Sequence, residues 1–254
     1  MFALLSTLGV VLGGGLVAVA CVVVKHRVFP PKADEEPREA LAEYISMMIG
    51  VIYALVLGLA LVSVWDTHSS AEEHVQTEAG ALHQVYLLAD ALPPAAEQQA
   101  RSTAVSYAHQ VTSGEWSEMI RRQPLDPSGW QLLNRLRDTY ETAQPTGAAQ
   151  QNAGQEAMAQ LSVLDEARRG READAQNRLS SVLWAGLFIG GVLTVGFMFL
   201  FGVQRRASHL VMVMGLSGFI VFLIVLIHQL DMPFGGALGV NAEAFTRYFP
   251  GSTG

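Results

Sequence analysis

Four titratable residues near the start of the polar middle of the chain have the side chains of a metal site. His68 and Glu72 are four residues apart, and so are His74 and Glu78. Each pair therefore shares one face of a helix, and two histidines with two carboxylates can hold zinc. The two pairs are offset by six residues, so they point in different directions around that helix. We interpret them as a solvated helix face, and we expect no bound metal and no other cofactor.

The remaining reactive side chains form no catalytic pattern. The single cysteine, Cys21, lies inside a long apolar run without a plausible histidine partner, so neither an intrachain disulfide nor a cysteine nucleophile is expected. The sequence also has no glycine-rich phosphate loop, no His-Glu-x-x-His run and no serine nucleophile elbow. We therefore predict that the protein is not an enzyme.

Arginines cluster in a segment that is otherwise acidic. Residues 66–179 contain 16 acidic residues, nine arginines and no lysine, which argues against nucleic-acid binding. Arg168 and Arg169 are candidates for an outer vestibule that gathers anions, because charge-lined clefts raise the local concentration of counter-ions. The alternative, which we favour, is that these arginines form ion pairs with neighbouring Glu and Asp residues.

Long apolar runs flank the segment that carries these charged residues and histidines. Four runs of about 20 residues, enough to cross a bilayer as a helix, have no Asp, Glu, Lys or Arg in their interior. Their bounds are 2–24, 44–65, 181–203 and 209–230. Because only helices and closed barrels satisfy their backbone in lipid, we predict an all-α membrane protein with four transmembrane helices. The predicted parts are a transmembrane hairpin (1–65), a helical bundle outside the membrane (66–179), a second hairpin (180–231) and an interfacial tail (232–254).

Positive charges next to the spans predict the orientation of the chain, because Lys and Arg accumulate on the cytoplasmic side. The two short loops carry such residues at Lys25, Arg27, Lys32, Arg38, Arg205 and Arg206. Both termini and residues 66–179 are therefore predicted to be extracytoplasmic. The Arg- and Ala-rich, Lys-poor composition suggests a bacterium, and hence its inner or plasma membrane.

The pattern of residues 66–179 is helical throughout. Apolar residues spaced three and four apart predict a helix that continues from the second span to Pro93-Pro94. A second helix is expected from 95 to about 120, and a third from Pro127 with Asp126 as its N-cap. Residues 144–154 are expected to be a loop, followed by a fourth helix, so we predict an antiparallel bundle. In the tail, a short interfacial helix is expected to carry three aromatic residues on one face, namely Phe245, Tyr248 and Phe249.

Span two supplies the candidates for a pore. Its small residues, four apart, either let helices approach closely or leave room for ions. The pore-lining candidates are Ser46, Ile49, Gly50 and Tyr53. Tyr53 is equally consistent with a packed aromatic side chain. The polar candidates near the ends of span four are His209, His228 and Asp231, for which an ordinary interfacial role is the alternative because the cost of a polar group depends on depth.

Several short motifs, in order, resemble one known family. They are Ile49–Ala54 with Val64-Trp65, Val85–Ala89 with Leu92-Pro93, Glu115-Trp116, Leu164-Asp165 with Arg168-Arg169, Leu183-Trp184, and Leu230–Phe234. Together they are similar to the bacterial bestrophin-like domain from about residue 49 to residue 245. The resemblance implies kinship with bestrophins, which are oligomeric anion channels with four spans per subunit. Bestrophins place the segment between spans two and three in the cytosol, opposite to the orientation that the charges predict.

Two hypotheses about function follow. The leading one is an oligomeric channel that conducts small ions, with anions the class implied by the resemblance, through a pore lined by span two. The alternative is a non-conducting membrane scaffold or envelope sensor whose outer bundle binds a partner. Membrane lipid and further copies of the chain are the expected partners, and nucleic acid is not.

Overall fold

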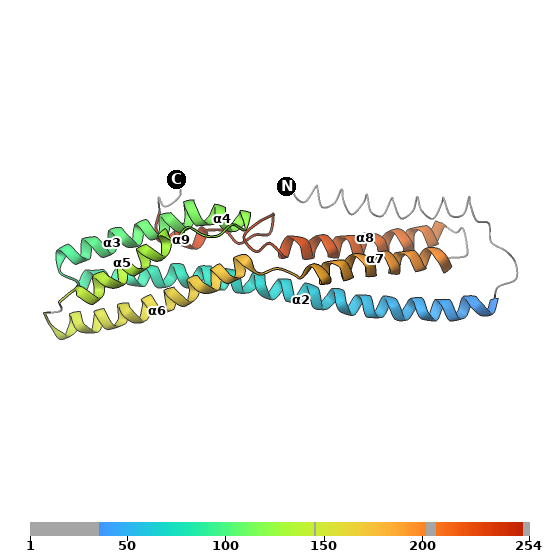
Figure 1. Ribbon diagram of the computed structural model, residues 1–254, viewed down its shortest axis with the longest axis horizontal. Coiled ribbons are helices and arrows are strands. Elements are labelled where there is room, and N and C mark those ends of the chain that lie inside the picture. The colour runs from blue at the N-terminus through green and yellow to red at the C-terminus, as the bar shows by residue number, and fades with distance from the viewer. Residues whose placement is uncertain (1–35, 145, 202–206, 251–254) are drawn as a thin grey trace. The chain divides into compact units, whose positions relative to one another are not determined.

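Helices make up every regular element that the structure describes. The computed structural model describes residues 36–144, 146–201 and 207–250 (Figure 1). It divides into two compact units, which we call the membrane unit (Met1–Trp65 and Arg178–Asp231) and the bundle unit (Asp66–Asn177 and Met232–Gly254). The prediction of an all-α protein is confirmed for the described residues. The predicted first span, 2–24, and Cys21 lie outside them.

The membrane unit contains the first part of α2 (Glu36–Leu88), α7 (Ser181–Phe201) and α8 (Ala207–Leu230). Two described helical segments are long and apolar enough to cross a membrane, one within Tyr44–Ala91 and one at Val211–Leu230. A third is counted if α6 of the bundle unit and the described start of α7 are taken as one broken span. The described residues therefore supply two or three candidate spans, and the count of four stays a prediction.

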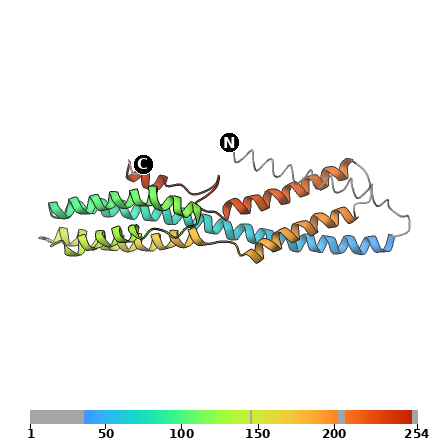
Figure 2. The ribbon, with the colours of Figure 1, turned by 45° about the horizontal axis from the view of Figure 1, so that its top comes forward.

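Apolar side chains on one side of each helix hold the membrane unit together. In α2 these side chains recur at a spacing of four, three and four residues, which keeps them on one helix face. They pack with buried residues of α7 and α8 in one cluster made up of Tyr53, Leu57, Ala60, Val64, Leu187, Ile220, Ile227 and Leu230. The helices α2, α7 and α8 can be followed in Figure 2.

The bundle unit contains the last part of α2, several further helical segments and the C-terminal tail. The helical segments include α3 (Pro94–His109), which continues through a π-helical segment (Gln110–Glu115) into α4 (Trp116–Arg121), then α5 (Ser128–Thr142) and α6 (Ala148–Gln176). In Figures 1 and 2, α3, α5 and α6 run alongside the last part of α2. Their core contains small, aliphatic and aromatic side chains, with Leu82, Leu133, Leu136, Leu161 and Leu164 completely buried.

The helix boundaries lie close to the local sequence signals, with one larger exception. A single 3-10 turn (Ala89–Ala91) ends α2 before Pro93, and Pro94 is the first residue of α3. α5 begins at Ser128 with Pro127 as its N-cap, one residue later than predicted, and the Asp126 carboxylate accepts a hydrogen bond from the backbone N–H of Ser128 (2.7 Å). The loop expected at 144–154 is wrong in its second half, because α6 already begins at Ala148. Ala and Gln are good helix formers, and they outweigh the single glycine at 154.

The tail does not have the membrane-facing aromatic side that we expected. Its short helix α9 (Glu243–Tyr248) is present, but Phe245 and Phe249 are buried in the core of the bundle unit. The Tyr248 ring stacks on His83 of α2 with centroids 4.5 Å apart. The correction has a simple cause: Phe245 and Phe249 remove more apolar surface from water by packing on α2 than they would at an interface.

Candidate functional site

A cluster of fully buried charges lies at the centre of the bundle unit. Glu78 of α2, Glu115 of the π-helical segment, and Arg168 and Arg171 of α6 are all 0% exposed. Two carboxylates face two guanidinium groups, so the formal charges cancel. This balance is what makes the burial tolerable, since an unpaired charge in such a place is very costly.

The π-helical segment explains how Glu115 reaches the cluster. Buried side chains follow one another at Val111, Glu115 and Met119, each four residues after the last. In a regular α-helix of 3.6 residues per turn, steps of four drift around the helix axis. The wider π turn at Gln110–Glu115 offsets this drift and keeps the three side chains on the buried side.

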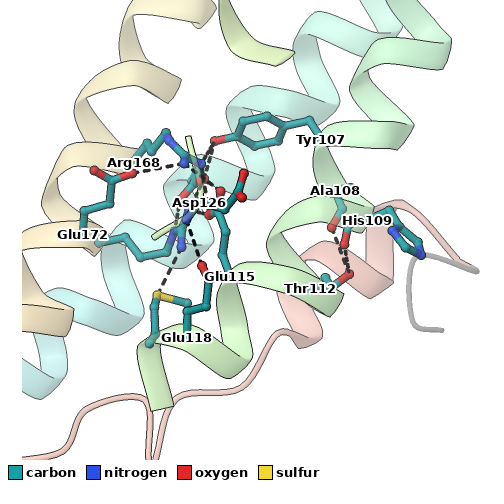
Figure 3. A network of polar contacts seen from close by, with 12 residues as sticks. Tyr107, Ala108, His109, Thr112, Glu115, Glu118, Asp126, Arg168 and Glu172 are labelled. Atoms are coloured by element: carbon teal, nitrogen blue, oxygen red, sulfur yellow. Dashed lines mark hydrogen bonds and ion pairs between the residues drawn. The ribbon is translucent and has the colours of Figure 1, made fainter. Parts of the chain in front are cut away.

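Arg168 is held by three polar side chains and one aromatic ring, and its polar contacts are drawn in Figure 3. Its Nη2 donates to Glu115 Oε1 (2.7 Å), and its Nη1 donates to Glu115 Oε2 and to the Tyr107 hydroxyl, both at 3.1 Å. Glu172 Oε1 lies 3.1 Å from Nη2 as an ion pair, although it lacks the geometry of a hydrogen bond. The guanidinium also lies over the Trp130 ring, 4.9 Å from its centroid. Such forked charge-assisted contacts fix the side chain in one orientation.

Arg171 completes the cluster from one helical turn further along α6. Its Nε and Nη2 donate to the two oxygens of Glu78 at 2.5 and 3.0 Å, and Nη2 also donates to Glu115 Oε2 at 2.8 Å. The Tyr107 hydroxyl donates to Glu78 Oε1 at 2.5 Å. Glu78 thus accepts from α3 and α6, and Glu115 accepts from two arginines of α6. The cluster therefore ties α2, α3, the π-helical segment and α6 together.

The charges shift one another's pKa values. Burial raises the pKa of the Glu115 carboxyl, but the two arginines outweigh it and hold that pKa below its ordinary value. For Tyr107, burial and then the negative charge of Glu78 raise the pKa of the hydroxyl well above its usual range. Burial also raises the pKa of Glu172 at the edge of the cluster, against the pull of Arg168. The raised pKa of Tyr107 fits its role as the hydrogen-bond donor to Glu78, because a donor must carry its proton.

A second cross-helix pair lies one turn along from the cluster. His74 Nδ1 of α2 is 2.7 Å from Asp174 Oδ2 of α6, and the His74 ring lies against Gly170, where a Cβ would come within 2.5 Å of it. The expectation of a solvated face for these residues is therefore wrong for Glu78, and His74 is half-buried. Among the described residues, no group of three or more His, Cys, Asp or Glu is placed to hold a metal ion.

The two vestibule candidates lie in different surroundings. Arg168 is buried in the cluster, whereas the Arg169 side chain is 70% exposed and pairs with Asp165 at 2.7 Å. Both therefore make the ion pairs of the alternative interpretation, and a vestibule role stays a prediction. Sequence reasoning did not predict that Glu78, Glu115 and Arg171 are buried together. The available signal was their position on the apolar stripes of their helices, where charged residues are otherwise rare.

In the membrane unit, Tyr53 lies against α7. Its side chain is 6% exposed, and its ring occupies the space beside Gly190, where a Cβ could not fit. Its hydroxyl lies 3.0 Å from the Cβ position of Gly191 and has no hydrogen-bond partner among the described residues. The two glycines of α7 thus serve close packing within the subunit, as small residues do in membrane helices.

The other pore-lining candidates share that side of α2. Ser46, Ile49 and Gly50 precede Tyr53 at spacings of three and four residues and are half-buried. The opposite side of α2 carries exposed apolar residues, among them Val51 and Leu55, each 65% exposed. The structure therefore distinguishes two faces of α2, one packed on its own unit and one open, and pore lining stays a prediction for either.

The polar candidates at the ends of the last span have separate roles. Asp231 accepts a hydrogen bond from the backbone N–H of Leu179 (2.8 Å) and so ties the end of α8 to the start of α7. The exposed His228 ring meets Trp184 edge-on, with centroids 5.8 Å apart. His209 lies in α8, but its side chain is outside the described residues. The structure brings none of the three together in one site.

Comparison with known proteins identifies the family. A family model for the bestrophin-like domain matches residues 15–245. A crystal structure of a mutant bacterial bestrophin homolog from Klebsiella pneumoniae has a TM-score of 0.64 at 14% identity, covering 96% of this chain and 97% of that chain. A second structure of a bacterial bestrophin homolog from this organism, phased with zinc, has a TM-score of 0.62 at 15% identity, covering 97% and 95%.

At these identities the likeness is one of fold. No curated protein matches the chain in sequence. The family match covers most of the chain and agrees with the all-helical fold and the candidate spans. We conclude that this chain is a membrane protein that belongs to the bestrophin-like domain family.

Proposed function

We propose that the chain is one subunit of a homo-oligomeric channel that conducts small ions through a pore lined by α2. Family membership and the resemblance to bestrophins support this function and make anions the first class of ion to test. In the proposal four helices span the inner membrane of a bacterium, and both termini and the bundle unit are extracytoplasmic. The proposal assigns no catalytic reaction to the protein.

The observation that carries the proposal is the open face of α2. Tyr44, Val51, Leu55 and Val62 follow one another at spacings of seven, four and seven residues, which keeps them on one helix face, and all are exposed. No charged side chain interrupts this face between residues 44 and 65. A ring of such faces, one from each subunit, would form an apolar constriction of the kind that gates by dewetting. We therefore propose the face of Val51 and Leu55, rather than the packed face of Tyr53, as the pore wall.

Ion flux from liposomes that contain the purified protein tests the proposal. Chloride and potassium gradients are compared for wild type and for Leu55→Ser, which makes the proposed wall wettable. We expect chloride flux that exceeds potassium flux, and a severalfold rise in Leu55→Ser. Val192→Ser is the matched control, because Val192 is an exposed apolar residue of α7 (73% exposed). Its flux should equal that of wild type.

Three results would contradict the proposal. The first is no flux from protein shown to be inserted, and the second is an equal change in both variants. The third is a change in Ile49→Ser but not in Leu55→Ser, which would move the pore to the packed side of α2. Protease access to the bundle unit in oriented vesicles tests the extracytoplasmic placement separately.

A membrane scaffold or sensor is the second candidate function. The bundle unit favours it, because this unit has its own complete core and a polar cavity between α2 and the tail. Absence of flux from correctly inserted protein would make this the leading function.

A further inference from the structure

A polar cavity in the bundle unit belongs to neither the buried cluster nor the proposed pore. It has a volume of about 490 Å³ and lies between α2 and the C-terminal tail. That volume lies within the range of small-molecule pockets. Its polar lining comes from His68, Glu72 and Gln76 of α2 and from Asn241, Glu243 and Arg247 of the tail.

The walls of this cavity are built on buried residues. On one side Val75 is 1% exposed and belongs to the bundle core. On the other side Ala244 precedes Phe245, which is completely buried in the same core. Leu238 and Val240 add apolar surface between the polar groups. The cavity is therefore preformed, with apolar walls and a few polar groups, as ligand sites usually are.

The hydrogen bond of His68 fixes which of its nitrogens can accept. His68 Nε2 lies 2.7 Å from the carbonyl oxygen of Leu238. A carbonyl oxygen can only accept, so Nε2 must carry the hydrogen. In the neutral ring Nδ1 is then an acceptor. The cavity thus includes a histidine whose second nitrogen suits an N–H donor.

The charges at the cavity also favour a cationic guest. Glu72 and Glu243 are both exposed carboxylates, and Arg247 is the one Lys or Arg among the described residues that line the cavity. Arg247 pairs with Glu243 at 3.4 Å, with both side chains about two-thirds exposed. An exposed pair of this kind contributes little and can give way to a ligand. Glu72 accepts a 3.2 Å hydrogen bond from Gln76 of the same helix.

We propose that this cavity binds a small aliphatic amine that carries two ammonium groups. One ammonium donates to Glu72 and His68 Nδ1, and the other donates to Glu243. The methylene chain between them lies against Val75, Leu238 and Val240. A metal ion is not the proposed guest, because no set of three ligating side chains is present among the described residues.

Calorimetric titration of the purified full-length protein in nonionic detergent tests the proposal. The probe is 1,4-diaminobutane, with the neutral isostere 1,4-butanediol as the control ligand, both at fixed ionic strength. We expect saturable binding of the diamine with a Kd at or below about 1 mM, and no binding of the diol. Losing one charge-assisted contact should weaken binding about tenfold in Glu72→Gln and in Glu243→Gln.

Glu141→Gln is the matched variant, because it removes the same charge from an exposed position on α5 outside the cavity. Its Kd should equal that of wild type. The proposal is overturned if the diamine does not saturate, or if Glu141→Gln weakens binding as much as Glu72→Gln. The proposal is equally overturned if the diamine no longer binds once sodium chloride is added at the ionic strength that the diamine itself contributes. The measurement needs no ion conduction, so its result is independent of the proposed channel function.

Discussion

Replacing Glu115 by Gln should strongly destabilise the bundle unit. Glu115 is completely buried and accepts three hydrogen bonds from Arg168 and Arg171, at 2.7, 2.8 and 3.1 Å. Gln keeps the shape but removes the charge, which leaves two buried guanidinium groups facing Glu78 as the remaining fully buried carboxylate, with the half-buried Glu172 beside Arg168 at the edge of the cluster. Breaking a buried ion pair by removing one partner costs about 3–5 kcal/mol. We expect the free energy of unfolding of the bundle unit to fall by about this amount.

Urea unfolding followed by tryptophan fluorescence measures the effect. The background carries Trp65→Phe and Trp184→Phe, so that the remaining tryptophans, Trp116 and Trp130, both report on the bundle unit. With a urea dependence of about 1–3 kcal/mol per molar, the midpoint should fall by at least about 1 M. Glu141→Gln, on the surface of the same unit, should change the free energy of unfolding by no more than about 0.5 kcal/mol.

A double-mutant cycle decides whether the pairing is the cause. Glu115→Gln combined with Arg168→Gln should lose less stability than the sum of the two single variants, with a coupling of about 0.5–3 kcal/mol. The reasoning fails if Glu115→Gln costs less than about 1 kcal/mol, or if the two losses simply add. In either case the carboxylate would not be holding the arginines in place.

Three further predictions concern pH and close packing. The pKa of Glu115 is lowered in the folded protein, so its stabilisation is present above the unfolded pKa and is lost as the pH falls through the folded pKa. Urea midpoints below about pH 4 should therefore fall more steeply for wild type than for Glu115→Gln, and parallel curves would contradict this. In Gly129→Ala the new methyl group meets the Glu115 carboxylate, so the bundle unit should lose about 1–3 kcal/mol, and an unchanged urea midpoint would count against the geometry. Gly190→Ala places a methyl group into the Tyr53 ring and should lower the melting temperature of the protein in detergent. Gly186→Ala, which has open space at its Cβ, should leave the melting temperature unchanged. Equal melting temperatures of the two variants would rule out the Tyr53 contact.

The helical bundle and the apolar runs could be predicted because their signals are local. Spacings of three and four residues, Pro93-Pro94 and Asp126 mark helices and their ends whatever lies nearby. The early start of α6 shows the limit of such signals, since a Gly/Ala/Gln stretch is polar enough for a loop and also helical enough to extend a packed helix. The aromatic tail shows the same limit, because an apolar face does not say whether lipid or protein will cover it.

The candidate site depended on contacts that no local pattern encodes. Arg171 and Glu78 are 93 residues apart in the chain, and Arg168 and Glu115 are 53 apart. In the sequence Glu78 follows the i, i+4 spacing of a solvated helix face, and only the packing of α2, α3 and α6 buries it.

The sequence by itself determined that this chain has apolar helices long enough to cross a membrane and an acidic helical segment between them, because length, hydropathy and periodicity are properties of the chain alone. The tertiary structure decided which charges are buried together and which face of α2 packs on its own unit. The physical reason is that a helix fixes only which residues share a face, whereas burial depends on the helices that pack against it, here α7 and Gly190 for Tyr53 and α6 for Glu78.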